Sequence, residues 1–189
     1  MSADYVSRCI DEHRSAVDAL AAIGDQVAAV GSVLVDVLQA GGRVFLCGNG
    51  GSAADAQHIA AEMTGRFETE RPGLPASALT VDSSAMTAIS NDYGFDRIFA
   101  RQVEALARPG DCLIGISTSG TSGNVVTAVE AAKAAGVTTI GLAGRDGGTL
   151  ASLCDHCLTV PHAVTARIQE CHILIGHIWC GMIDEACTP

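Results

Sequence analysis

The stretch RVFLCGNGGS, from Arg43 to Ser52, determines the fold class of this chain. Residues 43–47 are mostly apolar and predict a short buried strand. The glycines that follow end the strand, and Ser52 is a plausible N-cap for a helix that we expect to reach Met63. A strand, a glycine loop and a helix in direct succession are typical of α/β proteins.

The same succession recurs along the chain. Apolar runs predict further strands at residues 76–81, 112–116, 137–142 and 157–160. Helical periodicity predicts helices at residues 5–23, 26–39, 83–90, 95–106, 125–135 and 163–186. We interpret residues 144–148 as a loop and residues 65–75 as a polar excursion. Strands that alternate with helices predict a parallel sheet covered by helices on both faces, here with an added N-terminal helical segment.

Length and composition limit the classes of function. We expect a single domain over residues 1–189, because one core usually holds on the order of 100–200 residues. With 11 basic and 21 acidic residues, the net charge is −10, which argues against a broad nucleic-acid or anionic-membrane surface. The amino terminus lacks a signal-peptide pattern and no apolar run is long enough for a membrane span, so we expect a cytoplasmic protein. We interpret most of the eight cysteines as reduced core thiols.

Two loops could hold an anion despite this charge. The backbone of Gly48–Ser52 can approach a phosphate or sugar oxygen at a helix N-terminus, although a simple tight turn is an alternative. The loop also fits a dinucleotide-binding pattern, but the acidic residue expected about 20 residues later is absent. Residues 117–122 offer hydroxyls and a glycine that could cradle a phosphate, or could merely supply an N-cap. They lack the last glycine of a serine-hydrolase elbow.

His58 and Glu62 lie four residues apart and therefore share a helix face. They could bind a metal ion or move protons together with Gln169, His172 or His177 from the last helix. Taken alone, such histidines are more often surface or core residues. We interpret the C-x-x-C at residues 154–157 as incidental, and we leave residues 91–92 open between a turn and a ligand contact.

Four motifs in order resemble those of the sugar isomerase (SIS) domain family: residues 47–52, 91–95, 115–120 and 167–170. The resemblance covers nearly the whole chain and implies a three-layer, flavodoxin-like α/β fold of about five parallel strands. It also implies a homotetramer with sites between subunits, and we expect residues 3–40 and the last helix to pack between copies. The implied reaction converts sedoheptulose 7-phosphate to D-glycero-D-manno-heptose 7-phosphate, the first step of bacterial heptose biosynthesis.

The resemblance also implies the site residues. The positions for one Zn²⁺ per subunit match His58, Glu62, Gln169 and His177. The phosphate loop matches Ser117, Thr118, Ser119 and Ser122. The remaining expected substrate contacts are Asn49, Gly50, Gly51, Ser52, Glu62, Arg66, Asn91, Asp92 and Gln169. Glu62 and His177 are the expected acid/base pair for isomerisation through an enediol.

The chain departs from the family pattern at Ala166, where some members have an aspartate. Two alternatives to the enzyme remain open at this point. Residues 66–72 are similar to a non-catalytic SIS adaptor that binds a replication initiator, but the presence of Glu62 and His177 favours the isomerase. Another SIS isomerase, or a sensor for a different sugar phosphate, is the second alternative.

Overall fold

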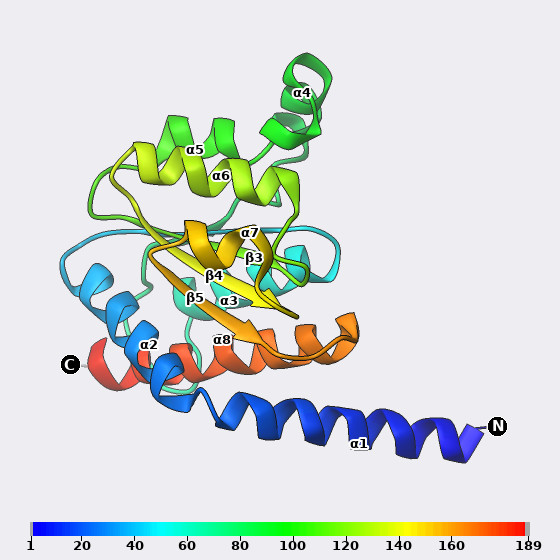
Figure 1. Ribbon diagram of the computed structural model, residues 1–189. Helices are drawn as coiled ribbons and strands as arrows, with labels where there is room; N and C mark the ends of the chain where they lie inside the picture. The colour runs from blue at the N-terminus through cyan, green and yellow to red at the C-terminus, as the bar shows by residue number, and fades with distance from the viewer. Residues whose placement is uncertain (1, 188–189) are drawn as a thin grey trace.

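The computed structural model describes residues 2–187 and confirms the α/β architecture. Its one sheet has the strand order β2-β1-β3-β4-β5 (Figure 1). The strands are β1 (Val44–Gly48), β2 (Ala76–Ala78), β3 (Cys112–Ser117), β4 (Thr138–Gly144) and β5 (His156–Val160). Every neighbouring pair is parallel, and Gly48 at the end of β1 lies beside Ile116 in β3. The loops that follow these two strands therefore start at the same edge of the sheet.

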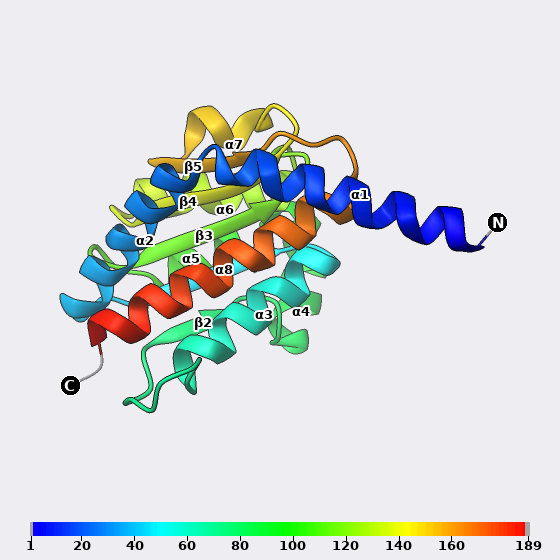
Figure 2. The same ribbon diagram turned by 90° about the horizontal axis from the view of Figure 1, so that it is seen from below.

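Helices cover both faces of the sheet (Figures 1 and 2). One face carries α2 (Gly24–Gln39), α3 (Gly51–Thr64) and α8 (Thr165–Cys187). The other carries α5 (Ala100–Leu106), α6 (Gly123–Ala134) and α7 (Gly148–Leu153). The remaining helices are α1 (Ser2–Ala21), α4 (Ser83–Tyr93) and the short 3-10 helix η1 (Phe95–Arg97).

Alternation along the strands builds two cores. In β1, Val44 and Leu46 belong to the core under α8, whereas Phe45 and Cys47 belong to the core under α5 and α6. Both faces of a parallel sheet are covered, so β1 is apolar and buried along its whole length, which is why the sequence predicts it. Full burial of one such aliphatic side chain contributes about 1.5–3 kcal/mol relative to leaving it exposed.

The structure corrects several of the predicted boundaries. Ser52 is not an N-cap: α3 begins at Gly51 after Gly50, whose φ of +57° favours glycine, and Ser52 is buried in the first turn. The turn is so tight that a Cβ on Gly48 would lie 2.8 Å from the Ser52 carbonyl oxygen.

Other predicted elements differ in extent. The predicted helix at 95–106 is divided into η1 and α5, and β2 ends at residue 78 instead of 81. The loop predicted at 144–148 already contains the start of α7, a helix that we did not predict.

Helix α1 extends past the sheet (Figure 1) and leaves Tyr5, Val6 and Ile10 exposed. Its second half is attached to α8, where His13 Nδ1 lies 2.7 Å from Glu170 Oε2. Over residues 2–187 no single helix has the length and apolar composition to cross a membrane. The two N-terminal helices meet that test only together, with a bend of 69° between them.

Candidate functional site

Three predicted site residues meet between α3 and α8, which lie side by side in Figure 2. His58 Nε2 lies 3.1 Å from Glu62 Oε1 on the same helix and 3.4 Å from His177 Nε2 on α8. The two imidazole rings meet edge to face, with centroids 4.9 Å apart. A carboxylate and two imidazoles are thus available to one bound molecule.

The helices approach closely because glycines face larger side chains across the contact. A Cβ on Gly176 would lie 2.6 Å from Ile59 Cδ1, and a Cβ on Gly51 would lie 2.6 Å from Gln169 Nε2. Gln169 is therefore placed with its amide against the start of α3, about two helical turns before His177.

His58, Glu62 and His177 offer three side chains that could hold a zinc ion. Within residues 2–187, no three histidine, cysteine, aspartate or glutamate side chains are arranged as a metal site. The pairwise spacing nevertheless fits, because bonds of about 2.0–2.1 Å in a tetrahedral site put neighbouring ligand atoms about 3.3 Å apart. Imidazole nitrogens and a carboxylate are ordinary zinc ligands. The chemistry of these three side chains and the two distances from His58 therefore fit zinc.

Asp55 lies on α3, three residues before His58. Its Oδ2 is buried without a hydrogen-bond partner. Burial raises the pKa of Asp55 above its ordinary value, and the nearby His58 opposes that shift. This carboxyl group was not among the predicted site residues.

Three hydroxyl groups of the loop after β3, at residues 117–122, lie close together, and we refer to this loop as the hydroxyl cradle. Ser117 Oγ lies 2.8 Å from Ser122 Oγ and 3.4 Å from Ser119 Oγ, at the N-terminus of α6. Ser122 occupies the N-cap position, but its side chain makes no capping bond. Simple N-capping therefore does not account for these hydroxyls. Gly120, with φ of +68°, packs against the backbone of Gly147, so the loop before α7 supports the cradle.

Asn124 joins the two loops and was missed by the sequence analysis. Its side-chain amide exchanges two hydrogen bonds of 2.8 Å with that of Asn49, one in each direction. Asn124 is buried in the first turn of α6, and Asn49 follows β1. Only the pairing of β1 with β3 brings these residues together, so no local sequence pattern could have identified the contact.

The other predicted contacts lie at the surface of the single chain. Asn91 Nδ2 donates to Asp92 Oδ1 over 2.8 Å, and α4, which carries both residues, is without a buried residue. Arg66 is exposed, with Nε 3.7 Å from Glu70 Oε2. Within residues 2–187, these three residues form no hydrogen bond or ion pair with His58, Glu62 or His177.

Comparisons with known proteins identify the family of this chain. Residues 10–144 match the family model described as "SIS domain". The chain is 61% identical over 154 residues to a phosphoheptose isomerase of a Nitratiruptor species, covering 82% of each chain. It is 52% identical over 182 residues to one of a Roseiflexus species, covering 96% of this chain and 91% of the relative.

A solved phosphoheptose isomerase from Neisseria gonorrhoeae superimposes with a TM-score of 0.92 at 47% identity, covering 98% of this chain and 100% of that one. The enzyme from Francisella tularensis gives a TM-score of 0.94 at 40% identity, covering 98% and 99%. The chain therefore belongs to the SIS domain family, among its phosphoheptose isomerases.

Proposed function

We propose that this protein is an aldose–ketose isomerase that converts sedoheptulose 7-phosphate to D-glycero-D-manno-heptose 7-phosphate in bacterial heptose biosynthesis. The observation that carries the proposal is the meeting of His58, Glu62 and His177 between α3 and α8. It occurs in a chain whose relatives at 50–61% identity are named phosphoheptose isomerases.

Glu62 and His177 are the proposed acid/base pair. Isomerisation of a ketose requires removal of a proton from C1 and delivery of a proton to C2 through an enediol. A carboxylate and an imidazole that both lie within 3.4 Å of His58 can serve one substrate without a large movement between the two steps. Asn49, Gly50 and Gly51 are the proposed sugar contacts, because their loop begins at the same edge of the sheet as the hydroxyl cradle.

The hydroxyl cradle is the proposed phosphate site. Ser117, Thr118, Ser119 and Ser122 lie at the N-terminus of α6, where free backbone N–H groups and the helix dipole favour an anion. Binding energy from the phosphate then holds the distant reacting carbons at the acid/base pair. This arrangement explains how a chain of net charge −10 can take an anionic substrate.

We propose one Zn²⁺ per subunit, held by His58, Glu62, Gln169 and His177. The distances of 3.1 Å from His58 to Glu62 and 3.4 Å from His58 to His177 support these three residues as ligands. When bound, zinc would polarise the sugar oxygens as a Lewis acid.

A homotetramer is the proposed working form. The exposed apolar side chains of α1 offer an interface, and the exposed Arg66, Asn91 and Asp92 are then free to complete the site of a neighbouring copy. The cytoplasm is the proposed compartment, because all eight cysteines are free thiols and a reducing environment keeps them so.

The test is turnover of sedoheptulose 7-phosphate by the purified protein, before and after removal of metal with a chelator and after return of zinc. We expect turnover that is lost on chelation and restored by zinc, and little activity on six-carbon phosphates. Glu62→Gln and His177→Gln should each abolish turnover, whereas Glu130→Gln, an exposed carboxylate on α6, should not. An inactive zinc-loaded wild type would refute the activity, and normal rates in either site variant would refute the acid/base assignment.

A further inference from the structure

We propose that the buried ion pair between Arg71 and Asp184 is a positioning device for the acid/base pair. In this view it holds the end of α3, residues 65–75 and α8 together, so that Glu62 and His177 stay aligned. The inference rests on the proposed function for its kinetic consequences, but its structural consequence can be measured without turnover.

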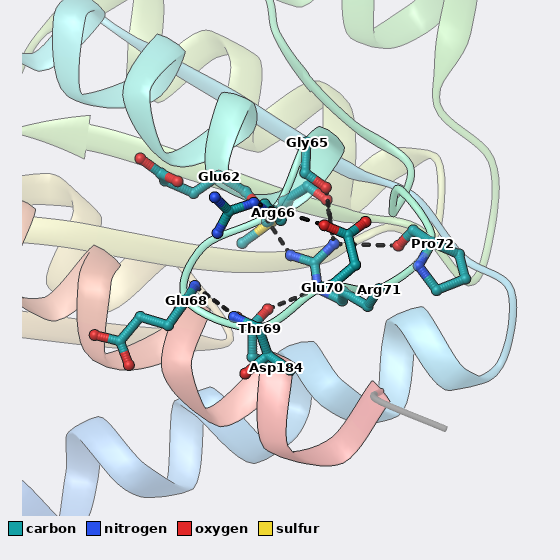
Figure 3. A network of polar contacts seen from close by, with 10 residues as sticks. Glu62, Gly65, Arg66, Glu68, Thr69, Glu70, Arg71, Pro72 and Asp184 are labelled. Carbon is teal, nitrogen blue, oxygen red and sulfur yellow. Dashed lines mark hydrogen bonds and ion pairs between the residues drawn. The ribbon is translucent and has the colours of Figure 1, made fainter.

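Arg71 completes the end of the helix that carries Glu62. The last carbonyl groups of an α-helix have no partners within the helix. Arg71 Nη2 donates to the Glu62 carbonyl oxygen over 2.9 Å (Figure 3). Arg71 Nη1 donates to the Met63 carbonyl oxygen over 2.8 Å. The guanidinium therefore fixes the backbone of Glu62 itself, and its charge suits the negative end of the helix dipole.

Asp184 connects this arginine to α8. Arg71 Nε donates to Asp184 Oδ1 over 2.6 Å, and Asp184 Oδ2 accepts bonds of 2.9 Å from the backbone N–H groups of Glu68 and Thr69. Both charged side chains are almost fully buried, at 0% and 3% exposed. Burial alone would raise the pKa of Asp184, but the hydrogen bonds from Thr69 and Arg71 lower it, so the carboxylate stays charged.

The network reaches His177 in two ways. Asp184 lies seven residues after His177, close to the same face of α8. Phe67, directly before the first backbone group bound by Asp184, stacks on the His177 ring with centroids 5.4 Å apart and planes 26° from parallel. The pair thus controls both the helix beneath His177 and the ring that faces it.

Stability alone is a poor explanation for this pair. A buried ion pair can often be replaced by well-packed apolar residues without loss of stability, because desolvation offsets the attraction. What apolar residues could not do is bind the carbonyl groups at the end of α3 and the N–H groups beside Phe67.

The chain contains a matched control. Arg43 and Asp111 form a second ion pair, with Nη2 and Oδ2 2.7 Å apart and the carboxylate buried. They lie immediately before β1 and β3, and within residues 2–187 neither side chain bonds to α3, residues 65–75 or α8. Substitution there should weaken the fold without moving Glu62 or His177.

The experiment compares Asp184→Asn and Arg71→Lys with Asp111→Asn and Arg43→Lys, each as the zinc-loaded full chain. We expect the first two variants to lose about 10- to 100-fold in kcat, because small misplacements of catalytic groups cost that much, with KM changed less than about threefold. The control variants should keep kcat within about twofold at a similar loss of melting temperature. Equal losses of kcat in both pairs would overturn the inference.

Two further measurements test the inference if the ion-pair variants fail to fold or if the wild type is inactive. Phe67→Leu keeps an apolar side chain and should lower kcat at an unchanged melting temperature even if the ion-pair variants fail to fold; wild-type kcat in Phe67→Leu would count against the inference. A crystal structure of Asp184→Asn should show the His58 and His177 Nε2 atoms farther apart than 3.4 Å. An unchanged distance would overturn the inference. An inactive wild type would refute only the proposed function, because the distance can be measured without turnover.

Discussion

At the scale of single residues, Asn124 determines the orientation of the Asn49 side chain in the glycine loop. Its paired hydrogen bonds with Asn49 hold that amide in one orientation. A buried amide that loses its partner costs about 1–3 kcal/mol, so the pair acts as a unit. The proposed contact of Asn49 with the sugar therefore depends on Asn124.

Asn124→Ala should raise KM for the sugar phosphate about tenfold or more, because Asn49 loses its fixed orientation. Steady-state kinetics together with a melting curve would measure the effect. Thr127→Ala is the matched control, since Thr127 lies one turn further along α6 and donates only to the Gly123 carbonyl oxygen. A wild-type KM in Asn124→Ala would show that the amide pair is not needed for binding.

His172 makes the fold sensitive to pH in a defined window. It is fully buried, with Nε2 2.9 Å from the Ala143 carbonyl oxygen and Nδ1 without a partner. Burial lowers the pKa of His172 to about 4, against an ordinary 6.5. Between pH 6.5 and 4 the unfolded chain therefore binds a proton that the folded chain does not bind. The free energy of unfolding falls as the pH drops through that window.

This histidine should contribute about 3 kcal/mol to the loss of unfolding free energy between pH 6.5 and 4. Urea unfolding followed by the fluorescence of Trp179, at fixed protein concentration, would measure it. His172→Gln should flatten the pH dependence, whereas His162→Gln, in the loop after β5, should leave it unchanged. Identical pH dependence in His172→Gln and the wild type would disprove the assignment.

At the scale of elements, the contact between α3 and α8 is the feature on which the site depends. Gly51 and Gly176 allow the two helices to approach, and Gln169 and Ile59 occupy the space that a methyl group would need. A substitution at Gly51 can therefore displace a site residue without lowering the stability of the helix.

Gly51→Ala should reduce turnover and zinc affinity while the fold survives. The new Cβ would lie 2.6 Å from the Gln169 amide nitrogen, so that flexible side chain has to move. Alanine is up to about 1 kcal/mol better than glycine within a helix, so the melting temperature should not fall. Gly24→Ala, where nothing lies within 4 Å of the new methyl group, is the control. Unchanged zinc affinity in Gly51→Ala would remove Gln169 from the proposed ligands.

Elements that bury both faces or carry long periodic patterns could be predicted from the sequence. β1, β3 and β4 are apolar runs, and α8 is long enough for its period to be recognised. The six residues of α7 are too few to show a helical period. Arg71 and Asp184 lie 113 residues apart, so no local sequence pattern pairs them. Only the packing of α8 on α3 gives them partners.

At the scale of the whole molecule, α1 leaves an apolar surface that its own chain does not cover. Ile10→Asp should lower the sedimentation coefficient from that of the proposed tetramer and reduce turnover with it, because a charge in an interface is costly to desolvate. Val81→Asp, at an exposed apolar residue between β2 and α4, should change neither. An unchanged assembly in Ile10→Asp would exclude this surface from the interface.

The hydroxyl cradle has a consequence for how substrate arrives. Without lysine or arginine among residues 117–122, attraction acts only at short range, while the net charge of −10 repels a phosphorylated sugar at long range. Added salt shortens the reach of that repulsion to about 10 Å at 0.1 M ionic strength. The rate of encounter, and with it kcat/KM, should therefore increase with ionic strength. Enzymes that attract anions with a positive electrostatic potential behave in the opposite way.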